Sequence, residues 1–525
     1  MPTRPVPLTA DEAVARIADG STVAVTGSGG GLLEPDALLA ALERRFLRTG
    51  GPRGLTFVHA LGIGDRDRRG TNRFAHEGLT RRVIGGHWTW SPRLMELARG
   101  DRIEGYALPS GVISQLFREI GARRPGLVTR TGLGTFADPR SGGGKVNATA
   151  REDLVELLHL DGREYLRYRP FPVDVALVRG SAADRRGNIT CAREPAQLDA
   201  LAVAQAARAS GGLVVAQVKE RHSNLLDPRS VHIPYPLVDA VVVVPDQWQT
   251  YSGEYEPSLC GDAPAGEFVP DLADPVRAVI ARRAALEVPD GAVLNLGFGV
   301  SSQVVDALAM EGRLDEVTLV IEQGLVDGIP FSGDLFGIAR GPGAVLPSTV
   351  QFDLFSGGLL DVCCLGMAEL DGTGSVNVSL LGGRPGGPGG FIDISQHARK
   401  AVFCGTFTAK GLDVAVLPQG ALRIRAEGQV PKLVDRVGQV TYSGELAREE
   451  GREAVYVTER AVFRLTPEGV ELTEVADGVD VQREVLDRIG FTPIVRDVRP
   501  MPREILRAAS ASREGPTERA GRAER

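Results

Sequence analysis

The sequence predicts an α/β protein made of two tandem domains, each with an open, mostly parallel β-sheet covered by helices. Apolar runs such as 173–178, 212–218 and 240–244 show no alternation of polar and apolar residues, which is the pattern of strands buried on both faces. Segments of helical periodicity lie between such runs, as expected for parallel strands joined by helices. Two short patterns also recur in the same order in both parts of the chain, which indicates a repeated fold.

The first domain is predicted to span residues 1–256. In chain order we expect a helix at 11–18, strands at 21–26, 55–60 and 82–86, and helices at 37–46 and 92–99, followed by the three apolar runs as strands. The strand at 21–26 runs into the turn 27–31, which contains four glycines. A strand, a glycine turn and a helix form the arrangement in which backbone N–H groups meet an anion.

A change in composition separates the two predicted domains. Residues 257–275 contain four prolines together with several Gly, Asp and Glu residues, and we interpret them as a linker. The second domain, 276–507, is expected to begin with a helix at 276–286 and a strand at 292–296. The tail, 508–525, is rich in Arg, Glu, Ala, Ser and Gly and lacks a packing face, so we expect it to be disordered.

The internal repeat supports the tandem interpretation. The strand at 20–25, its glycine turn and the following helix are echoed by 291–296, a glycine turn and 304–308. Residues 180–190 recur, with one insertion, as 366–379. Glycine turns after strands are common, so a chance match is the alternative.

Composition and charge exclude several classes of function. The chain of 525 residues carries a net charge of −7, which gives no basic surface for nucleic acid. No apolar run approaches the length of a membrane span, and residues 1–10 lack the features of a signal peptide. The five cysteines form no CxxC pair and the seven histidines no HExxH motif, so we expect a cytoplasmic protein without a metal site or disulfides.

A single carboxylate stands at the end of a predicted strand in the second domain. The β-branched run 317–321 stops at Glu322, and glycines at 324 and 328 and then Pro330 turn the chain sharply. Ligands of open α/β sheets bind outside the carboxyl ends of strands, where Glu322 would lie. Taken alone, a surface Glu in a loop after a strand is the commoner case.

The most unusual loop of the chain follows later, at 382–391. Six of the nine residues 382–390 are glycine, and ordering such a loop is entropically costly. It could be a flexible hairpin tip, but its exposed amides could also bind a developing oxyanion. The glycine turns at 27–31 and 297–299 lack the complete GxGxxG pattern and there is no GxxxxGK[ST] loop, which leaves amide-lined anion or thioester sites as their plausible function.

Few other polar residues qualify for catalysis. Asn377 lies in the strand-like run 376–379, although such an Asn more often caps a turn. His87, beside Trp88 and Trp90, is the most suggestive histidine, although a His near aromatic residues is usually packing. With no GxSxG setting and no Ser/His/Asp order, a carboxylate is the best candidate nucleophile, and Glu322 is the best placed.

These motifs together resemble a known family. The residues that carry the resemblance are 132–140 with 143–145, 171–176, 187–190, 322–324 with 328–330, 351–353, 387–394 and 402–408. In this order they resemble the family I CoA-transferases, specifically the single-chain acetate/propionate type in which two subunit-like halves are fused. The resemblance covers roughly residues 10 to 500 and implies the CoA-transferase (NagB/RpiA-like) fold in both halves.

The resemblance implies roles for individual residues. Glu322, in the E-x-G motif, would be the nucleophile, with Asn377 assisting it. Backbone amides of Gly389 and Gly390 would bind the oxyanion. We further expect the glycines that contact CoA to be Gly297, Gly299 and Gly387.

Two departures from the family pattern flank the candidate nucleophile. The Ser-Glu-Asn-Gly of two-subunit members reads Ile-Glu-Gln-Gly here, with Gln323 after the Glu. A Gly-Gly pair of the family reads Asp327-Gly328. These departures bear on which acyl group is accepted rather than on the reaction.

The implied function is transfer of CoA from a short-chain acyl-CoA to acetate, propionate or a related carboxylate through a glutamyl-CoA thioester. Acyl-CoA and carboxylates would be the only partners besides further copies of the chain in a homo-oligomer, with no tightly bound cofactor, nucleic acid or membrane. An acyl-CoA hydrolase and a 3-oxoacid-specific CoA-transferase are the nearest alternatives. A dinucleotide-dependent oxidoreductase lacks its glycine fingerprint, and a non-catalytic metabolite sensor on the same fold stays possible.

Overall fold

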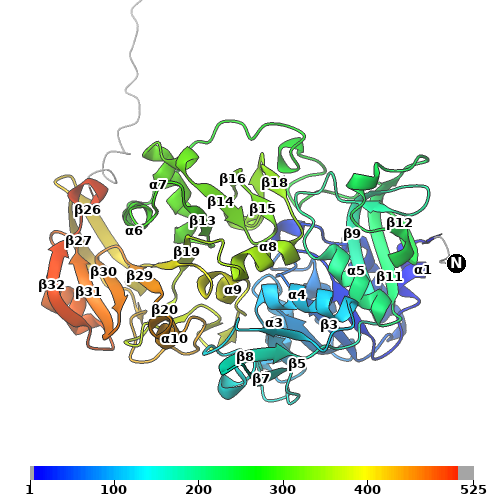
Figure 1. Cartoon of the computed structure of the whole chain (residues 1–525), viewed down its shortest axis with the longest axis horizontal. Helices are drawn as coiled ribbons and strands as arrows, with labels where there is room; N and C mark the ends of the chain where they lie inside the picture. Colours follow the sequence, from blue (N-terminus) through cyan, green and yellow to red (C-terminus); the bar gives the residue numbers. More distant parts are fainter. Residues whose placement is uncertain (1–4, 507–525) are drawn as a thin grey trace, which may run out of the picture.

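The computed structural model describes residues 5–506, which form two α/β units of similar construction (Figure 1). We call residues 5–256 the N-terminal half and residues 276–506 the C-terminal half. The tail at 508–525, which the sequence predicts to be disordered, lies outside the described residues.

A sheet of nine strands forms the centre of the N-terminal half. Its strands are β1 (Val6–Pro7), β2 (Thr22–Val25), β3 (Leu55–His59), β4 (Thr80–Gly85), β5 (Glu104–Ala107), β9 (Val175–Ala183), β10 (Ile189–Thr190), β11 (Leu213–Arg221) and β12 (Ala240–Val243). Their order is β1-β12-β11-β9-β2-β3-β4-β5, and all neighbours on this path are parallel. The short β10 pairs antiparallel with β9.

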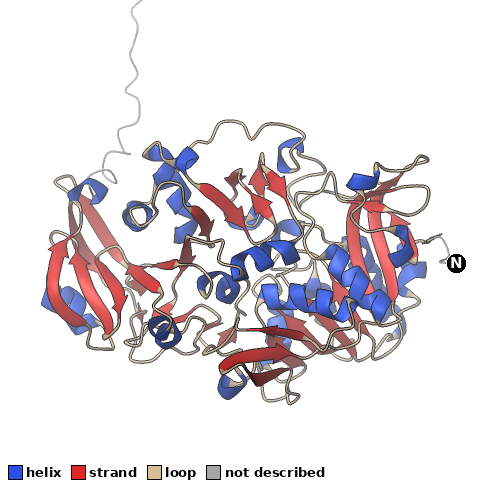
Figure 2. Cartoon of the chain, viewed as in Figure 1, coloured by secondary structure: helices blue, strands red, loops and turns tan. Residues whose placement is uncertain are grey.

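Helices cover both faces of this sheet (Figure 2). They are α1 (Ala10–Val14), α2 (Asp36–Thr49), α3 (Pro92–Arg99), α4 (Ser110–Gly121) and α5 (Ala200–Ala209). Val23 and Phe57 pack with α1, α2 and α3, whereas their neighbours Ala24 and Val58 pack with α4 and α5. Because both faces are buried, apolar residues occupy successive positions of these strands, which is why the sequence shows no regular alternation.

A second sheet of ten strands lies in the C-terminal half. Its strands are β13 (Val293–Leu296), β14 (Thr318–Ile321), β15 (Leu325–Val326), β18 (Ala344–Val345), β19 (Val362–Gly366), β24 (Lys400–Cys404), β29 (Glu453–Val457), β30 (Ala461–Thr466), β31 (Gly469–Val475) and β32 (Ile494–Pro500). The order is β18-β15-β14-β13-β19-β24-β29-β30-β31-β32. The run from β14 to β29 is parallel, while β15 and β18 at one end and β30 and β31 at the other pair antiparallel. The predicted mostly parallel fold is confirmed, with antiparallel margins that the sequence did not predict.

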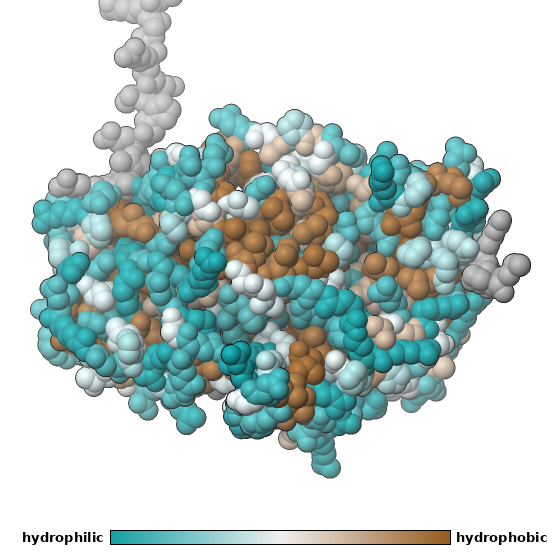
Figure 3. Space-filling model, viewed as in Figure 1, coloured by the Kyte–Doolittle hydropathy of each residue, from teal (hydrophilic) through white to brown (hydrophobic). Residues whose placement is uncertain are grey.

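The helices of the C-terminal half again form two layers. They are α6 (Pro275–Ala285), α7 (Val304–Met310), α8 (Ser348–Ser356), α9 (Phe391–Ser395) and α10 (Gly444–Glu449). The first two pack on one face of the sheet and the other three on the opposite face. Figure 3 shows apolar side chains at the surface near the middle of this view, and Val350 and Leu354 of α8 are among the exposed apolar residues.

Short strands outside the two large sheets shape the loops. They are β16 (Ile329–Pro330) with β17 (Ala339–Arg340), β20 (Glu369–Leu370) with β21 (Val376–Asn377), β22 (Leu380–Leu381) with β23 (Arg384–Pro385), β25 (Thr408–Ala409) with β28 (Val430–Pro431), β26 (Asp413–Leu417) with β27 (Ala421–Ala426), and β6 (Leu127–Thr129), β7 (Val155–Leu160) and β8 (Arg163–Tyr168) in one small sheet. The segment 257–275 contains the 3-10 helix η6 (Pro257–Leu259). Helix α6 follows, and its N-terminus is capped by the Asp274 carboxylate, which accepts hydrogen bonds from the Val276 and Arg277 amides.

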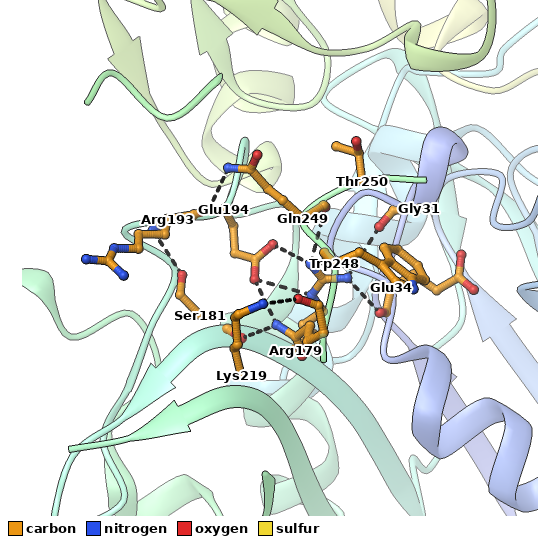
Figure 4. Close-up of polar contacts among 12 residues, drawn as sticks. Gly31, Glu34, Arg179, Ser181, Arg193, Glu194, Lys219, Trp248, Gln249 and Thr250 are labelled. Carbon is orange, nitrogen blue, oxygen red and sulfur yellow. Dashed lines mark hydrogen bonds and ion pairs between the residues drawn. The ribbon is translucent and has the colours of Figure 1, made fainter. Parts of the chain in front are cut away.

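The glycine turn after β2 is buried rather than open to a ligand. A Cβ atom at Gly30 would lie 2.6 Å from the Asp334 carbonyl oxygen, and one at Gly31 would lie 2.4 Å from the Trp248 ring. Buried Arg179 on β9 fixes this packing, since its guanidinium pairs with Glu194 at 2.9 Å and donates to the carbonyl oxygen of Glu34 at 3.1 Å (Figure 4). The glycines at 27–31 therefore allow close packing, and the anion site considered for this turn is not formed in the structure.

Candidate functional site

Glu322 lies at the point that the strand pattern predicts. It follows the last residue of β14 directly, and its side chain lines a cavity of about 770 Å³. The carboxyl ends of β13 and β19 line the same cavity through Leu296 and Gly366. The chain runs from β13 to β14 on one side and later to β19 on the other, so the cavity lies where the direction of strand order changes, as in other open α/β sheets.

The glycine loop closes over the Glu322 carboxylate. A Cβ atom at Gly390 would lie 1.7 Å from Glu322 Oε2, so the backbone at 390 touches the carboxylate and only glycine fits there. Gly389 and Gly387 line the same cavity and have φ values of +56° and +74°, a region that favours glycine. The glycines at 387, 389 and 390 are thus explained by the site, whereas Gly382 and Gly383 form the turn of the hairpin between β22 and β23.

The amides of Gly389 and Gly390, which are expected to bind an oxyanion, differ in whether they already donate a hydrogen bond. The Gly389 N–H donates to the carbonyl oxygen of Gly86 at 2.8 Å, so it is already occupied, and this part of the expectation is not met. The Gly390 N–H donates to no acceptor among residues 5–506. Of these two amides, only that of Gly390 is therefore a free backbone donor beside the carboxylate.

Burial changes the proton affinity of Glu322. Loss of solvent raises the pKa of its carboxyl to about 7, and a weak hydrogen bond from the Gln323 side chain opposes this rise. The Gln323 Nε2 lies 3.4 Å from Glu322 Oε1 and 3.4 Å from the Ser28 hydroxyl. Gln323, one of the departures from the family pattern, is thus a direct neighbour of the carboxylate. Asp327, the other departure, is exposed and absent from the described cavity lining.

His87 reaches the cavity from the N-terminal half. Its ring lines the cavity and lies 3.3 Å from the position that a Gly389 Cβ atom would take. Burial lowers the pKa of His87 to about 4, so the imidazole is neutral at physiological pH. The flanking aromatic residues, Trp88 and Trp90, are buried in the core, which fits the packing interpretation for them but not for His87.

Asn377 does not face the cavity. Its Nδ2 donates to Glu369 Oε2 and to the Leu380 carbonyl oxygen, both at 2.7 Å, and its Oδ1 accepts from the Ser379 and Leu380 amides at 3.0 Å. All its hydrogen-bonding positions are therefore used in a turn. The structure does not bring Asn377 to Glu322, although its partner Glu369 lines the cavity.

The glycines expected to contact CoA separate into two groups. Gly297 and Gly387 line the cavity, whereas Gly299 is absent from its described lining. Between the two glycines of the 297–299 turn, the Phe298 side chain is 53% exposed and lines the cavity opening. It packs edge-on against Phe336 with the ring centroids 5.5 Å apart.

Sequence reasoning missed the roles of two ionisable residues in this region. Lys432 lines the cavity, burial lowers its pKa to about 8, and no carboxylate of residues 5–506 lies within 4.0 Å of its ammonium group. Asp393, in the first turn of α9, is buried close to Glu322. Lys432 belongs to no motif that could have indicated it, while Asp393 belongs to the 387–394 motif.

Groups of side chains suited to a metal ion are absent from the described part of the chain. No helix in that part is both long and apolar enough to cross a membrane.

Comparison with known proteins identifies the family. A family model described as coenzyme A transferase matches residues 8–244. The acetate CoA-transferase YdiF of Escherichia coli K12 is 42% identical over 495 residues, which cover 93% of this chain and 92% of that protein. The chain belongs to the coenzyme A transferase family. It is a single-chain family I CoA-transferase, as its motifs predict.

Other members of the family support the same assignment. The caffeate CoA-transferase of Acetobacterium woodii is 43% identical over 499 residues, covering 93% of this chain and 94% of that protein. The acyl-CoA transferase YdiF of E. coli O157:H7, solved as a thioester complex with CoA, superimposes with a TM-score of 0.91 at 40% identity over 96% of each chain. The predicted fold class and the prediction of a CoA-transferase are therefore confirmed.

Proposed function

We propose that this CoA-transferase moves CoA from a short-chain acyl-CoA to a carboxylate acceptor through a covalent Glu322–CoA thioester. The observation that carries the proposal is the contact between the Glu322 carboxylate and Gly390, whose amide has no acceptor among the described residues. This contact supports the proposal, because it would bring a nucleophile and an oxyanion donor together on the same cavity wall.

The first half-reaction has two steps. A Glu322 carboxylate oxygen attacks the acyl carbonyl carbon, and the C–S bond breaks to give an acyl-glutamyl anhydride and CoA thiolate. The thiolate then attacks the glutamyl carbonyl carbon, so that the first acid leaves as a carboxylate and a Glu322–CoA thioester remains. No net proton is taken up or released. A second carboxylate reverses these steps and restores the Glu322 carboxylate.

Three features of the cavity support this chemistry. The Gly390 N–H can stabilise each tetrahedral oxyanion, and a single such donor contributes about 3 kcal/mol to the barrier reduction. Partial burial removes water from the carboxylate, which makes it a stronger nucleophile and limits hydrolysis of the anhydride. Neutral His87 adds a polar group without a competing positive charge that would lower the reactivity of the carboxylate.

The relatives suggest which acids to test. The E. coli proteins are named for acetate and for acyl-CoA, and the A. woodii protein for caffeate. We propose acetate, propionate and related short-chain acids as the substrates of this chain. An aromatic acid belongs in the same panel, since a relative of equal similarity is named for one.

Two measurements test the proposal. Incubation of labelled acetate with acetyl-CoA and enzyme should move label into acetyl-CoA, with parallel-line ping-pong kinetics. Incubation with acetyl-CoA alone should produce a CoA adduct on the peptide that contains Glu322, detected by mass spectrometry after borohydride reduction. CoA release that needs no acceptor would favour the hydrolase alternative, and an adduct on another residue would refute the mechanism.

The proposed nucleophile predicts a pH profile. Only the Glu322 carboxylate attacks, and its pKa is raised to about 7, so the rate of adduct formation should fall as pH drops below this value. His87, with a pKa near 4, is neutral throughout this range. Lys432, with a pKa of about 8, should affect binding rather than this step. At saturating acyl-CoA, single-turnover rates between about pH 5 and 9 should therefore fit one ionisation near 7. A rate that stays constant down to about pH 5 would show that ionisation of Glu322 near pH 7 does not control adduct formation.

Lys432 should strengthen acyl-CoA binding. It places a partly buried positive charge on the cavity wall without an ion-pair partner among the described residues, and acyl-CoA carries negative charge. We expect Lys432→Met to raise KM for acyl-CoA about tenfold with little change in kcat. Lys145→Met, which removes a lysine paired with Asp153 outside the cavity lining, is the matched control. Equal KM values in the two variants would refute this role.

A further inference from the structure

Helix α9, which begins directly after Gly390, is bonded to the N-terminal half at both ends. At its C-terminal end, Gln396 Oε1 accepts a hydrogen bond from the Gly132 amide at 2.8 Å, and Gln396 Nε2 donates to the Arg130 carbonyl oxygen at 2.7 Å. At its N-terminal end, Asp393 Oδ2 accepts a hydrogen bond from the Gly111 amide at 3.1 Å. The helix therefore spans the boundary between the two halves.

The contact at the N-terminal end is tightly built. Asp393 is 2% exposed, and Gly111 is the second residue of α4, where a helix amide has no partner within the helix. A Cβ atom at position 111 would lie 2.5 Å from Asp393 Oδ1 and 2.5 Å from the Phe352 ring. Glycine at 111 is thus needed for the carboxyl group to reach the amide.

The backbone of the glycine loop rests on the same part of the N-terminal half. The Ser110 amide donates to the Gly389 carbonyl oxygen at 2.9 Å, and the Gly389 amide donates to the Gly86 carbonyl oxygen at 2.8 Å. These bonds hold the residue before Gly390, and the bond from Gly111 to Asp393 holds the turn of helix after it. Gly390 is therefore fixed from both sides by groups of the N-terminal half.

The protonation state of Asp393 fits a role as a hydrogen-bond acceptor. Burial raises the pKa of the Asp393 carboxyl well above its usual range, and the nearby Glu322 carboxylate raises it further. Both effects favour the protonated, uncharged carboxyl, whose carbonyl oxygen can still accept the hydrogen bond from Gly111. A neutral amide of the same shape should replace it, whereas a side chain without an acceptor should not.

We propose that Asp393 is a positioning residue, which by its bond to Gly111 holds the start of α9 so that the Gly390 amide stays against the Glu322 carboxylate. This inference rests on the proposed function, because Gly390 matters only if Glu322 reacts. The N-terminal half thereby takes part in the reaction, because its backbone groups hold the oxyanion donor in position.

Three substitutions of Asp393 test the inference, namely Asp393→Ala, Asp393→Leu and Asp393→Asn. Gln396→Ala is the matched control. The first two remove the acceptor, and Leu also keeps the site filled if the Ala variant fails to fold. Each should lower kcat roughly 100-fold through misplacement of the donor, with KM for acyl-CoA changed less than about threefold. Asp393→Asn should keep kcat within about threefold of the parent, because its amide oxygen still accepts from Gly111.

Gln396→Ala removes the hydrogen bonds to the Gly132 amide and the Arg130 carbonyl oxygen, at the other end of the same helix. It should lower the temperature of unfolding but keep kcat within about threefold. Equal kcat losses in Gln396→Ala and Asp393→Ala would overturn the inference, because they would indicate that docking of the two halves in general is what matters. An unchanged kcat in both Asp393→Ala and Asp393→Leu would also overturn it. Slow adduct formation on Glu322 in the Asp393 variants supports the inference, whereas a parent enzyme that forms no adduct refutes the proposed function itself.

Discussion

Glu322→Gln is expected to abolish CoA transfer. The amide is uncharged and a poor nucleophile, so neither the anhydride nor the thioester forms, and kcat should fall by at least about 10⁴-fold, as for other covalent nucleophiles. The adduct on the Glu322 peptide should disappear as well. Label exchange between acetate and acetyl-CoA measures the loss directly.

The fold of this variant should be intact and more stable above neutral pH. The Glu322 pKa is raised to about 7 in the folded protein, so the buried charge destabilises the folded state at higher pH. This destabilisation decreases as the pH falls below about 7 toward the pKa of Glu322 in the unfolded chain. The unfolding temperature of Glu322→Gln should therefore exceed that of the parent more at about pH 8 than at about pH 5.

A second buried glutamate provides the control. Glu34 is fully buried with its pKa raised to about 8, and its carboxyl accepts a hydrogen bond from the Tyr251 hydroxyl at 2.6 Å outside the described cavity lining. Glu34→Gln should keep transfer activity. Comparable activity in Glu322→Gln and Glu34→Gln would rule out Glu322 as the nucleophile.

Gly390→Ala is expected to have the next largest effect. Its methyl group would lie 1.7 Å from Glu322 Oε2, so either the carboxylate or the loop must move, and the free amide would leave its place. Loss of one oxyanion donor lowers kcat about 10²- to 10³-fold, and displacement of the carboxylate adds to this loss. Single-turnover formation of the Glu322 adduct measures both effects.

Gly386→Ala is the matched control in the same loop. Its methyl group would meet the Thr89 methyl group at 3.2 Å, and position 386 lacks a positive φ, so a small shift accommodates it. This variant should keep kcat within about tenfold of the parent. Similar losses in both variants would mean that the whole loop, rather than the amide at 390, is what the reaction needs.

Local patterns predicted the architecture and the central residue. The apolar runs without alternation indicated strands covered on both faces, and Ala24 and Val23 on β2 indeed pack into opposite helical layers. The strand that stops at Glu322 indicated a carboxylate at the edge where ligands bind. These features depend on neighbours a few residues apart, which a sequence shows directly.

The margins of the second sheet were beyond such reasoning. Strands β30 and β31 pair antiparallel with each other, and β30 with β29, beside a parallel sheet. Their residues are consistent with either direction, since buried strands of both kinds are rich in β-branched and aromatic residues. Which direction a strand takes is decided by the connection that precedes it.

What the sequence by itself determined is the family, the repeated α/β fold and the position of Glu322, because periodicity, turn glycines and ordered motifs are local. Only the tertiary structure decided that His87 and Lys432 line the cavity, that Gly86 occupies the Gly389 amide, and that Asn377 is used in a turn. The physical reason is that a hydrogen bond or a charge acts between neighbours in space. Gly390 is held to Glu322 by a helix and a loop of the other half, and no local pattern records that contact.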